Sequence, residues 1–237
     1  GIGKKDVLIC STGVIGVQLD MDVVEKGIGM LAPAMKADEE SASDAAEAIL
    51  TTDTHKKEIA VQCEIDGQTV VVGGMSKGSG MIHPNMGTML AFITSDAAIE
   101  HPLLQEILRE EVEDTFNMIS VDGDTSTNDT CCVLANGLAG NPVITEKGPD
   151  YDAFVEALRA LCVELAKKMA SDGEGATHLI TCTVTGAGSE QSAETVAKSV
   201  IGSALTKAAI FGADANWGRV LCAMGYSGED FNPDKVD

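Results

Sequence analysis

Two β-branched runs joined by a single Asp-Gly pair constrain the fold of this chain more than any other feature of its sequence. The runs are residues 58–65 and 68–74, and Asp66 and Gly67 lie between them. An Asp-Gly dipeptide suits a type I′ turn because both of its residues must adopt a positive φ, which Asp tolerates and Gly adopts freely. The sequence therefore predicts an antiparallel β-hairpin over these residues.

Hydrophobic periodicity outside this hairpin predicts long helices that alternate with short strands. Helices are expected over 21–35, 43–50, 103–117, 150–171 and 190–210. Further strands are expected over 7–10, 88–94, 118–121 and 177–185. Either Ser41 or Ser43 is expected to cap the second helix. This succession indicates an α/β (α+β layered) fold in which mixed sheets pack against long helices.

The composition limits both the core and the partners of the chain. Among the 237 residues, 44% are hydrophobic but only 3% are aromatic, so Ala, Val, Ile, Leu and Met must fill the core. The formal net charge of −21 repels nucleic acid and anionic membrane surfaces, so neither is expected as a partner. No apolar run approaches the length of a transmembrane helix, and no targeting peptide is visible.

The seven cysteines form no recognisable disulfide or metal pattern. Their number is odd and no pair has CxxC spacing, while several lie in apolar runs, as Cys10 does. These features indicate that the cysteines are small buried side chains of a protein in a reducing compartment. The four histidines also lack ligand spacing, so no metal site is expected.

A glycine-rich loop over 73–87 carries the most chemical information. Three glycines between 74 and 80 allow the backbone to approach a ligand or to adopt a positive φ. Pro84 fixes a bend and pushes His83 towards an extended conformation. Gly87 then precedes Thr88 directly, and an apolar strand begins at once.

A Thr hydroxyl that follows a residue without a side chain has what an N→O acyl shift needs. The Thr88 hydroxyl would attack the Gly87 carbonyl, and water would cleave the resulting ester to release Thr88 as a new N-terminus. The freed α-amine has an ordinary pKa of about 7.7–8.0, so its neutral fraction can accept the hydroxyl proton. Taken alone, however, a Gly-Thr pair indicates only the start of a strand.

The stretch from Lys77 to Leu90 resembles the self-cleavage segment of the ornithine acetyltransferases, also called bifunctional glutamate N-acetyltransferases. That family usually has Ala before its nucleophile, where this chain has Gly87, and a smaller residue does not block the acyl shift. Five further stretches look like family motifs in the family order: 11–16, 51–54, 121–129, 172–177 and 215–219. The resemblance spans nearly the whole chain and implies a self-cleaving enzyme with an N-terminal threonine nucleophile.

The resemblance also implies the catalytic residues. Thr88 would be the nucleophile that carries the acetyl group, and the bond between Gly87 and Thr88 would be the cleavage site. Thr12 and Gly13 would form the oxyanion hole, because a hydroxyl and a backbone N–H in a tight turn are suitable donors. Without the resemblance, residues 11–13 indicate only a turn.

The substrate-binding residues follow from the same resemblance. They would be Thr51, Lys77, Thr88 and Glu174. A zwitterionic amino acid needs a cation for its carboxylate and an anion for its amine, which Lys77 and Glu174 would supply. By themselves, these two residues would be interpreted as solvated loop charges.

The reaction implied is a step of arginine biosynthesis. The enzyme would move an acetyl group from N-acetylornithine to glutamate by a ping-pong mechanism, releasing ornithine and N-acetylglutamate. It would need no cofactor, although acetyl-CoA is a possible second acetyl donor. It would work in the cytoplasm, or in the matrix of a mitochondrion or plastid in a eukaryote.

Cleavage would divide the chain at one point. Residues 1–87 would be the C-terminal part of an α-chain and residues 88–237 the N-terminal part of a β-chain, with both pieces sharing one core. Two α and two β pieces would assemble as a heterotetramer. The family also has an N-terminal region and a C-terminal Asn and hydroxyl residue that have no match here, so we expect both ends to be missing.

Two other functions stay open. Asp122 and Asp124 follow a hydrophobic run, as in the nucleophile loop of Mg²⁺-dependent aspartyl phosphatases, although Ser126 stands where that family prefers Thr or Val. The structural interpretation of the same loop is a turn hydrogen-bonded by Asp, Ser and Thr side chains. The chain could also be an inactive fragment of the acetyltransferase.

Overall fold

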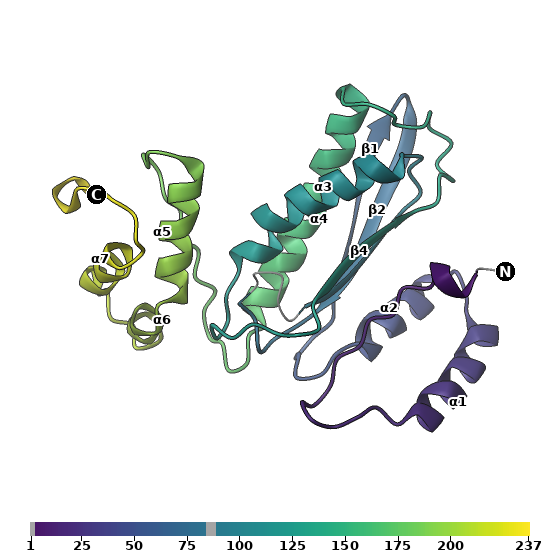
Figure 1. Cartoon of the computed structure of the whole chain (residues 1–237), viewed down its shortest axis with the longest axis horizontal. Coiled ribbons are helices and arrows are strands. Elements are labelled where there is room, and N and C mark those ends of the chain that lie inside the picture. Colours follow the sequence, from purple (N-terminus) through teal and green to yellow (C-terminus); the bar gives the residue numbers. More distant parts are fainter. Residues whose placement is uncertain (1–2, 84–88) are drawn as a thin grey trace.

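A four-stranded mixed sheet lies at the centre of the computed structural model, which describes residues 3–83 and 89–237. Its strands, in spatial order, are β1 (Lys57–Ile65), β2 (Gln68–Lys77), β3 (Leu90–Ser95) and β4 (Thr130–Ala135). β1, β2 and β3 pair antiparallel, whereas β3 and β4 pair parallel. The expected layered α/β class is confirmed (Figure 1).

The hairpin predicted from the Asp-Gly pair joins β1 to β2. Asp66 has a φ of 48° and Gly67 a φ of 73°, as a type I′ turn requires. The pairing runs from Ile65 opposite Gln68 back to Lys57 opposite Ser76. The end of β2 therefore lies beside the start of β1, and this end of the sheet carries the candidate site.

Two helices pack on one face of the sheet. Helix α4 (Pro149–Ser171) contacts β1 and β2, and it matches the predicted helix closely. Helix α3 (His101–Asp114) belongs to the long connection between the parallel strands β3 and β4, where a crossover helix is usual. It ends earlier than predicted, because a 3₁₀ turn (Phe116–Met118) follows it.

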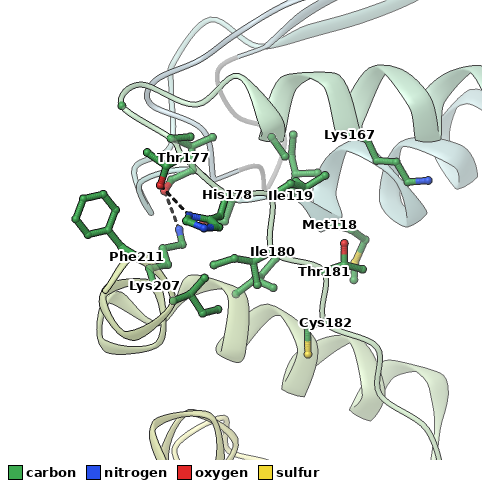
Figure 2. A pocket seen from close by; sticks show the side chains of 18 of the residues that line it. Met118, Ile119, Lys167, Thr177, His178, Ile180, Thr181, Cys182, Lys207 and Phe211 are labelled. Atoms are coloured by element: carbon green, nitrogen blue, oxygen red, sulfur yellow. Dashed lines mark hydrogen bonds between the residues drawn. The ribbon is translucent and has the colours of Figure 1, made fainter. Parts of the chain in front are cut away.

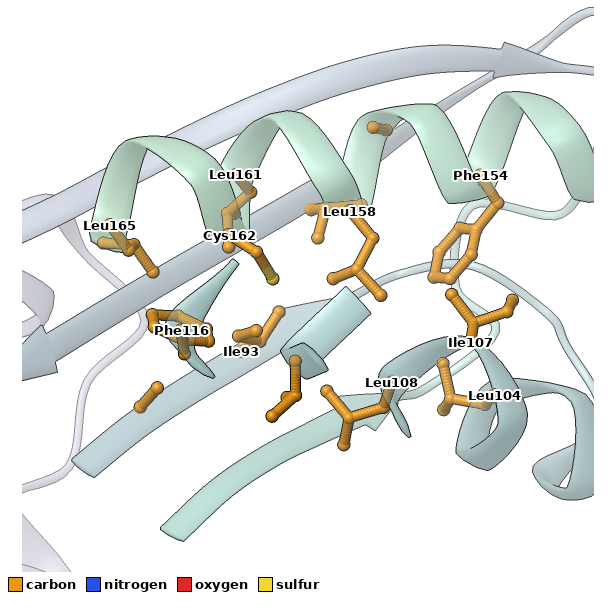
Figure 3. Close-up of a cluster of buried hydrophobic side chains, with 14 of the residues drawn as sticks. Ile93, Leu104, Ile107, Leu108, Phe116, Phe154, Leu158, Leu161, Cys162 and Leu165 are labelled. Atoms are coloured by element: carbon orange, nitrogen blue, oxygen red, sulfur yellow. The ribbon is translucent and has the colours of Figure 1, made fainter. Parts of the chain in front are cut away.

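The hydrophobic core fills the space between this face and the two helices (Figure 3). Alternate strand residues point into it, as the two-residue period of a strand requires. Buried core residues of β2 and β3 include Val70, Val72, Ala91 and Ile93, and those of α4 include Phe154, Leu158, Leu161 and Leu165. The core is mainly aliphatic, as the composition predicted.

The other helices flank this unit. They are α1 (Met21–Leu31), α2 (Glu39–Ala48), α5 (Glu190–Gly202), α6 (Ala204–Phe211) and α7 (Trp217–Gly225), with 3₁₀ turns at Lys4–Asp6, Ala32–Ala34 and Pro233–Lys235. Helices α5, α6 and α7 pack on one another and form a separate group in Figure 1. No helix in the described ranges has both the length and the apolar character needed to cross a membrane.

Two helix predictions need correction. Helix α2 begins earlier than expected, and its N-cap is Asp38, whose carboxylate accepts the N–H of Ser41 at 2.8 Å; neither Ser41 nor Ser43 is the cap. The helix predicted over 190–210 is two helices. Ser203 separates them, with an extended ψ of 114° and a side chain that caps α6.

Three predicted strands are wrong. Residues 7–10, 118–121 and 177–185 form no β-ladder in the described part of the chain. Ile9 is 87% exposed, so apolar character alone did not give that segment a partner. Val121 instead donates its N–H to the Ile82 carbonyl at 2.7 Å. Conversely, β4 was not among the predicted strands.

Candidate functional site

Three segments that lie far apart in the sequence meet at the end of β2. Lys77, the last residue of that strand, is 5% exposed, and its Nζ donates to Thr51 Oγ1 at 2.8 Å. The chain that follows contacts residues 172–174, since the Ser79 carbonyl accepts the Glu174 N–H at 2.8 Å. The structure thus brings together the three predicted substrate-binding residues that it describes.

Asp53 is the centre of the first contact region. Its Oδ1 accepts the Gly78 N–H at 2.7 Å, and its Oδ2 accepts the Thr51 N–H at 3.2 Å. The Lys77 ammonium lies 3.9 Å from Oδ2, beyond direct hydrogen-bond distance. Burial would raise the pKa of Asp53, but the hydrogen bonds from Lys57 and from these backbone groups lower it overall. Asp53 is therefore an anion that holds the ends of two loops.

A buried ion cluster extends from Asp53 to the end of α4. Lys57 is fully buried, and its Nζ donates to Asp53 Oδ1 at 2.7 Å and to Asp172 Oδ2 at 2.6 Å. Asp172 also accepts the N–H and the hydroxyl of Thr54, and His55 Nδ1 lies 3.3 Å from its Oδ1. Burial opposes ionisation of Asp172, but these partners outweigh it and lower its pKa to about 2.

Gly80 lets the loop after β2 approach Glu174. A Cβ at Gly80 would lie 2.6 Å from Glu174 Oε1, so a larger residue would displace that carboxylate. Ser79 is fully buried beside it, and its hydroxyl shares a hydrogen bond of 2.7 Å with Thr52 Oγ1. Of the two expectations for the three glycines, a positive φ is found at Gly78, at 146°, and approach of the backbone to a ligand stays a prediction.

Lys77 keeps hydrogen-bonding capacity for a ligand. Burial is the main reason why its pKa is lowered; the charge of Lys57 acts in the same direction, and those of Asp53 and Glu174 oppose it. Among the described residues, Thr51 Oγ1 is the acceptor of its single hydrogen bond. An ammonium has three donors. Two of them therefore have no acceptor in the described part of the structure.

Lys77 and the proposed oxyanion residue Thr12 lie on either side of one narrow gap, which is too tight to hold a water molecule. Its lining residues are Thr12, Lys77, Met89, Leu90 and Asn128. Thr12 is half-buried, whereas Gly13 is exposed and has space around its Cα. In the described ranges, neither the Thr12 hydroxyl nor the Gly13 N–H takes part in a hydrogen bond. Neither donor is therefore used by another group in residues 3–83 and 89–237.

The predicted nucleophile and cleavage site, Thr88 and Gly87, lie outside the described residues. The polar loop 122–130 holds the backbone on both sides of them through hydrogen bonds. The carboxylate of Asp122 accepts the N–H groups of Met81 and Ile82. On the other side, Asp129 Oδ1 accepts the Met89 N–H at 2.7 Å.

These contacts favour the structural interpretation of the 122–130 loop. Asp122 also accepts the Asp124 N–H at 3.1 Å, and Ser126 Oγ accepts the Asn128 N–H at 3.1 Å, which is the predicted turn network. Because the Asp122 carboxylate accepts backbone N–H groups with both oxygens, it is not free to act as the nucleophile of a phosphatase. No group of three potential metal ligands occurs within residues 3–83 and 89–237.

A larger cavity of about 390 Å³ lies between residues 174–182 and helices α5 and α6 (Figure 2). Most of its lining is apolar. Glu174 contributes to its wall, whereas Thr12 and Lys77 lie around the narrow gap described above. Lys207 donates to the Val121 carbonyl at 2.7 Å, and burial lowers its pKa despite the charge of Asp122. Glu174 is therefore the one predicted site residue in the described ranges that lines this larger cavity.

Sequence reasoning missed the residues that brace this site. Asp53 and Asp172 lie in the motif stretches 51–54 and 172–177, so their presence there was a usable signal. Lys57 gave no signal, because a lysine at the start of a strand is usually solvated. Asp129 ends the polar loop, and its Oδ2 is buried without a hydrogen-bond partner in the described structure.

Comparison with known proteins gives one consistent family. The model of the ArgJ family matches residues 1–237. The arginine biosynthesis bifunctional protein ArgJ of Symbiobacterium thermophilum is 56% identical over the whole chain, and that of Geobacillus stearothermophilus is 52% identical. The chain spans 58% and 57% of the lengths of these relatives.

A solved structure also resembles the chain. The crystal structure of the arginine biosynthesis bifunctional protein argJ from Bacillus halodurans aligns with a TM-score of 0.60 and 55% sequence identity. The alignment covers 61% of this chain and 68% of that structure.

Proposed function

The chain belongs to the ArgJ family, and from this premise we propose that it acts as an acetyltransferase that moves an acetyl group from N-acetylornithine to glutamate. One observation carries the proposal. Thr12 and Lys77 lie around the same narrow gap as Met89, the residue that follows Thr88 in the sequence. A proposed oxyanion donor and a proposed carboxylate ligand therefore lie beside the residue that follows the proposed nucleophile in the sequence.

Self-cleavage is the first step of the proposed mechanism. The Thr88 hydroxyl adds to the Gly87 carbonyl, and the Gly87–Thr88 amide bond breaks as an ester forms. Water then hydrolyses that ester. The products are a carboxylate at Gly87 and a free amine and hydroxyl at Thr88.

Acetyl transfer then proceeds in two halves on the freed threonine. The α-amine of Thr88 takes the hydroxyl proton as the oxygen attacks the acetyl carbonyl of N-acetylornithine, and ornithine leaves with that proton. The amine of glutamate next attacks the acetyl-threonine ester and regenerates Thr88. In both halves the Thr12 hydroxyl and the Gly13 N–H stabilise the negative charge on the acetyl oxygen, as donors placed in advance do.

Substrate binding is assigned to the cluster at the end of β2. The Lys77 ammonium, positioned by Thr51, binds the carboxylate of the amino-acid substrate, and Glu174 binds its amine. Such charge-assisted hydrogen bonds are about twice as strong as neutral ones. The proposal includes acetyl-CoA only as a possible additional donor for glutamate, and it requires no metal or resident cofactor.

The proposal extends to assembly and location. The pieces that end at Gly87 and begin at Thr88 stay together, and two of each form the heterotetramer. The relatives named above are bacterial proteins, which favours the cytoplasm over an organelle matrix.

Cleavage and turnover together test the proposal. The purified protein is expected to give two bands on a denaturing gel, with one new N-terminus at Thr88, and a Thr88→Ala variant is expected to give one band. The cleaved protein should transfer acetyl groups from N-acetylornithine to glutamate. Cleavage without transfer would instead support the alternative of an inactive fragment, and two bands from the Thr88→Ala variant would exclude the mechanism.

A further inference from the structure

Lys57 and Lys77 differ sharply in how many of their donors are used. All three donors of Lys57 are directed to protein oxygens: Asp53 Oδ1 at 2.7 Å, Asp172 Oδ2 at 2.6 Å and the His55 carbonyl at 3.3 Å. Lys77 makes its one hydrogen bond in the described structure to Thr51. Lys57 therefore has no donor left for a ligand, whereas Lys77 has two donors without an acceptor among the described residues.

Asp53 lies between the two lysines and could pair with either. Its Oδ1 is 2.7 Å from the Lys57 ammonium, but its Oδ2 is 3.9 Å from that of Lys77. Both side chains of the closer pair are fully buried, so their attraction is screened little by water. Lys57 is thus the cation nearest to Asp53, and Lys77 lies too far away to donate to it.

Asp172 fixes Lys57 in this position. Asp172 is 5% exposed, lies next to Gly173 and Glu174, and also holds the Thr54 N–H at 3.0 Å. The cluster of Asp53, Lys57 and Asp172 therefore ties the loop that carries Thr51 to the segment that carries Glu174. It also spans the proposed cleavage point, since Asp53 and Lys57 precede Gly87 and Asp172 follows it.

The geometry points to Lys57 as a positioning residue that, held by Asp172, occupies Asp53 and so keeps the Lys77 ammonium available for the substrate carboxylate. Lys57 touches no substrate in this scheme. The inference rests on the proposed function for its ligand, the amino-acid carboxylate. It goes beyond that function by assigning a task to three buried residues that take no part in the transfer.

Replacing Lys57 with Met tests this role because the side chains have similar length and only the ammonium is lost. Asp53 would then be left without its closest cation and should draw Lys77 away from Thr51. We expect the KM for glutamate to rise about tenfold or more, as when a charge-assisted hydrogen bond is lost, with a much smaller change in kcat. Cleavage after Gly87 should persist.

A double variant separates this electrostatic role from a general loss of stability. Lys57→Met combined with Asp53→Asn removes the carboxylate that would capture Lys77, so the KM should fall back towards the value of the unmodified protein. If Lys57 only stabilises the fold, the second substitution brings no recovery. Lys147→Met, which removes an exposed lysine paired with Glu106, is the matched control and should leave the KM unchanged.

A structural readout makes the test independent of turnover. In a crystal structure of the Lys57→Met variant, Lys77 Nζ should lie within hydrogen-bond distance of Asp53, and its contact with Thr51 should be lost. If that variant does not fold, Lys57→Met with Asp172→Asn, which removes one charge of each sign, replaces it in both measurements.

The outcomes distinguish the inference from the proposed function. An unchanged Lys77 position together with an unchanged KM would overturn the role of Lys57, whatever the enzyme does. A shifted Lys77 in a protein that never transfers acetyl groups would support the positioning role and refute the proposed reaction.

Discussion

Lys77 and Leu90 are paired across the β2–β3 ladder, so the last residue of β2 lies beside the strand that begins two residues after Thr88. Pairing continues from there to Val72 opposite Ser95. The proposed cleavage would therefore cut the connection between two strands that remain hydrogen-bonded to each other. Both strands also contribute to the same buried core.

We predict that the two pieces stay associated after cleavage. The ladder and the shared core hold them together without a covalent link, so the cleaved protein should elute as one species in native buffer. The pieces should separate only in denaturant. Size-exclusion chromatography followed by a denaturing gel measures this. Elution of separate pieces in native buffer would contradict the arrangement.

We predict that Lys77→Met weakens binding of the amino-acid substrate. The Lys77 ammonium, held by Thr51, is the proposed ligand of the substrate carboxylate, so the KM for glutamate should rise by about ten- to a hundredfold, as for the loss of a hydrogen bond between charged groups. Steady-state kinetics with Lys147→Met as control give the answer. Equal KM values for the unmodified protein, Lys77→Met and Lys147→Met would show that Lys77 does not bind the substrate.

The hairpin and the long helices were largely predictable, whereas the other strands and the site were predictable only in part. The Asp66-Gly67 turn and the apolar spacing of α4 are local signals, and local signals predict hairpins and helices well. Residues 7–10 have the same apolar character as a buried strand, but pairing depends on which segment lies nearby. The roles of Lys57 and Asp172 also depend on a non-local contact, since these two residues are 115 positions apart in the chain.

We predict that Asp129 makes stability depend on pH. Burial raises the pKa of its carboxyl to about 6, despite the hydrogen bond from the Met89 N–H. The protonated form is thus favoured in the folded state, so this residue's contribution is most favourable below its ordinary pKa and is lost as pH rises through about 6.

Asp129→Asn tests this effect, because Asn can still accept the Met89 N–H but carries no charge. Relative to the unmodified protein, the variant's free energy of unfolding should increase between about pH 4 and pH 7, by on the order of 1 kcal/mol after solvent screening. Urea titrations at several pH values measure the difference. A constant difference across this range would show that Asp129 does not titrate as described.

We predict that Gly74→Ala destabilises the fold by overpacking the interface between β2 and α4. A Cβ at this position would lie 3.0 Å from Leu161 Cδ2 and 3.3 Å from Leu165 Cδ1. The free energy of unfolding should fall by about 1–3 kcal/mol, the usual effect of an added methyl group in a close-packed core.

The matched control is Gly27→Ala in α1, where no heavy atom lies within 4 Å of the added Cβ. Alanine there should stabilise the helix by about 0.5–1 kcal/mol. Thermal unfolding of both variants compares them directly. If Gly74→Ala were as stable as the Gly27→Ala protein, the described packing of α4 on β2 would be wrong.

The most direct test of the account is the intact mass of the piece that begins at Thr88, measured before and after mixing the protein with N-acetylornithine alone. We predict that this piece gains the mass of one acetyl group, that fragmentation places the group on Thr88, and that adding glutamate removes it. A piece that never gains the acetyl group while the protein still catalyses transfer would contradict the threonine-bound intermediate, and a chain that remains uncut between Gly87 and Thr88 would contradict the account as a whole.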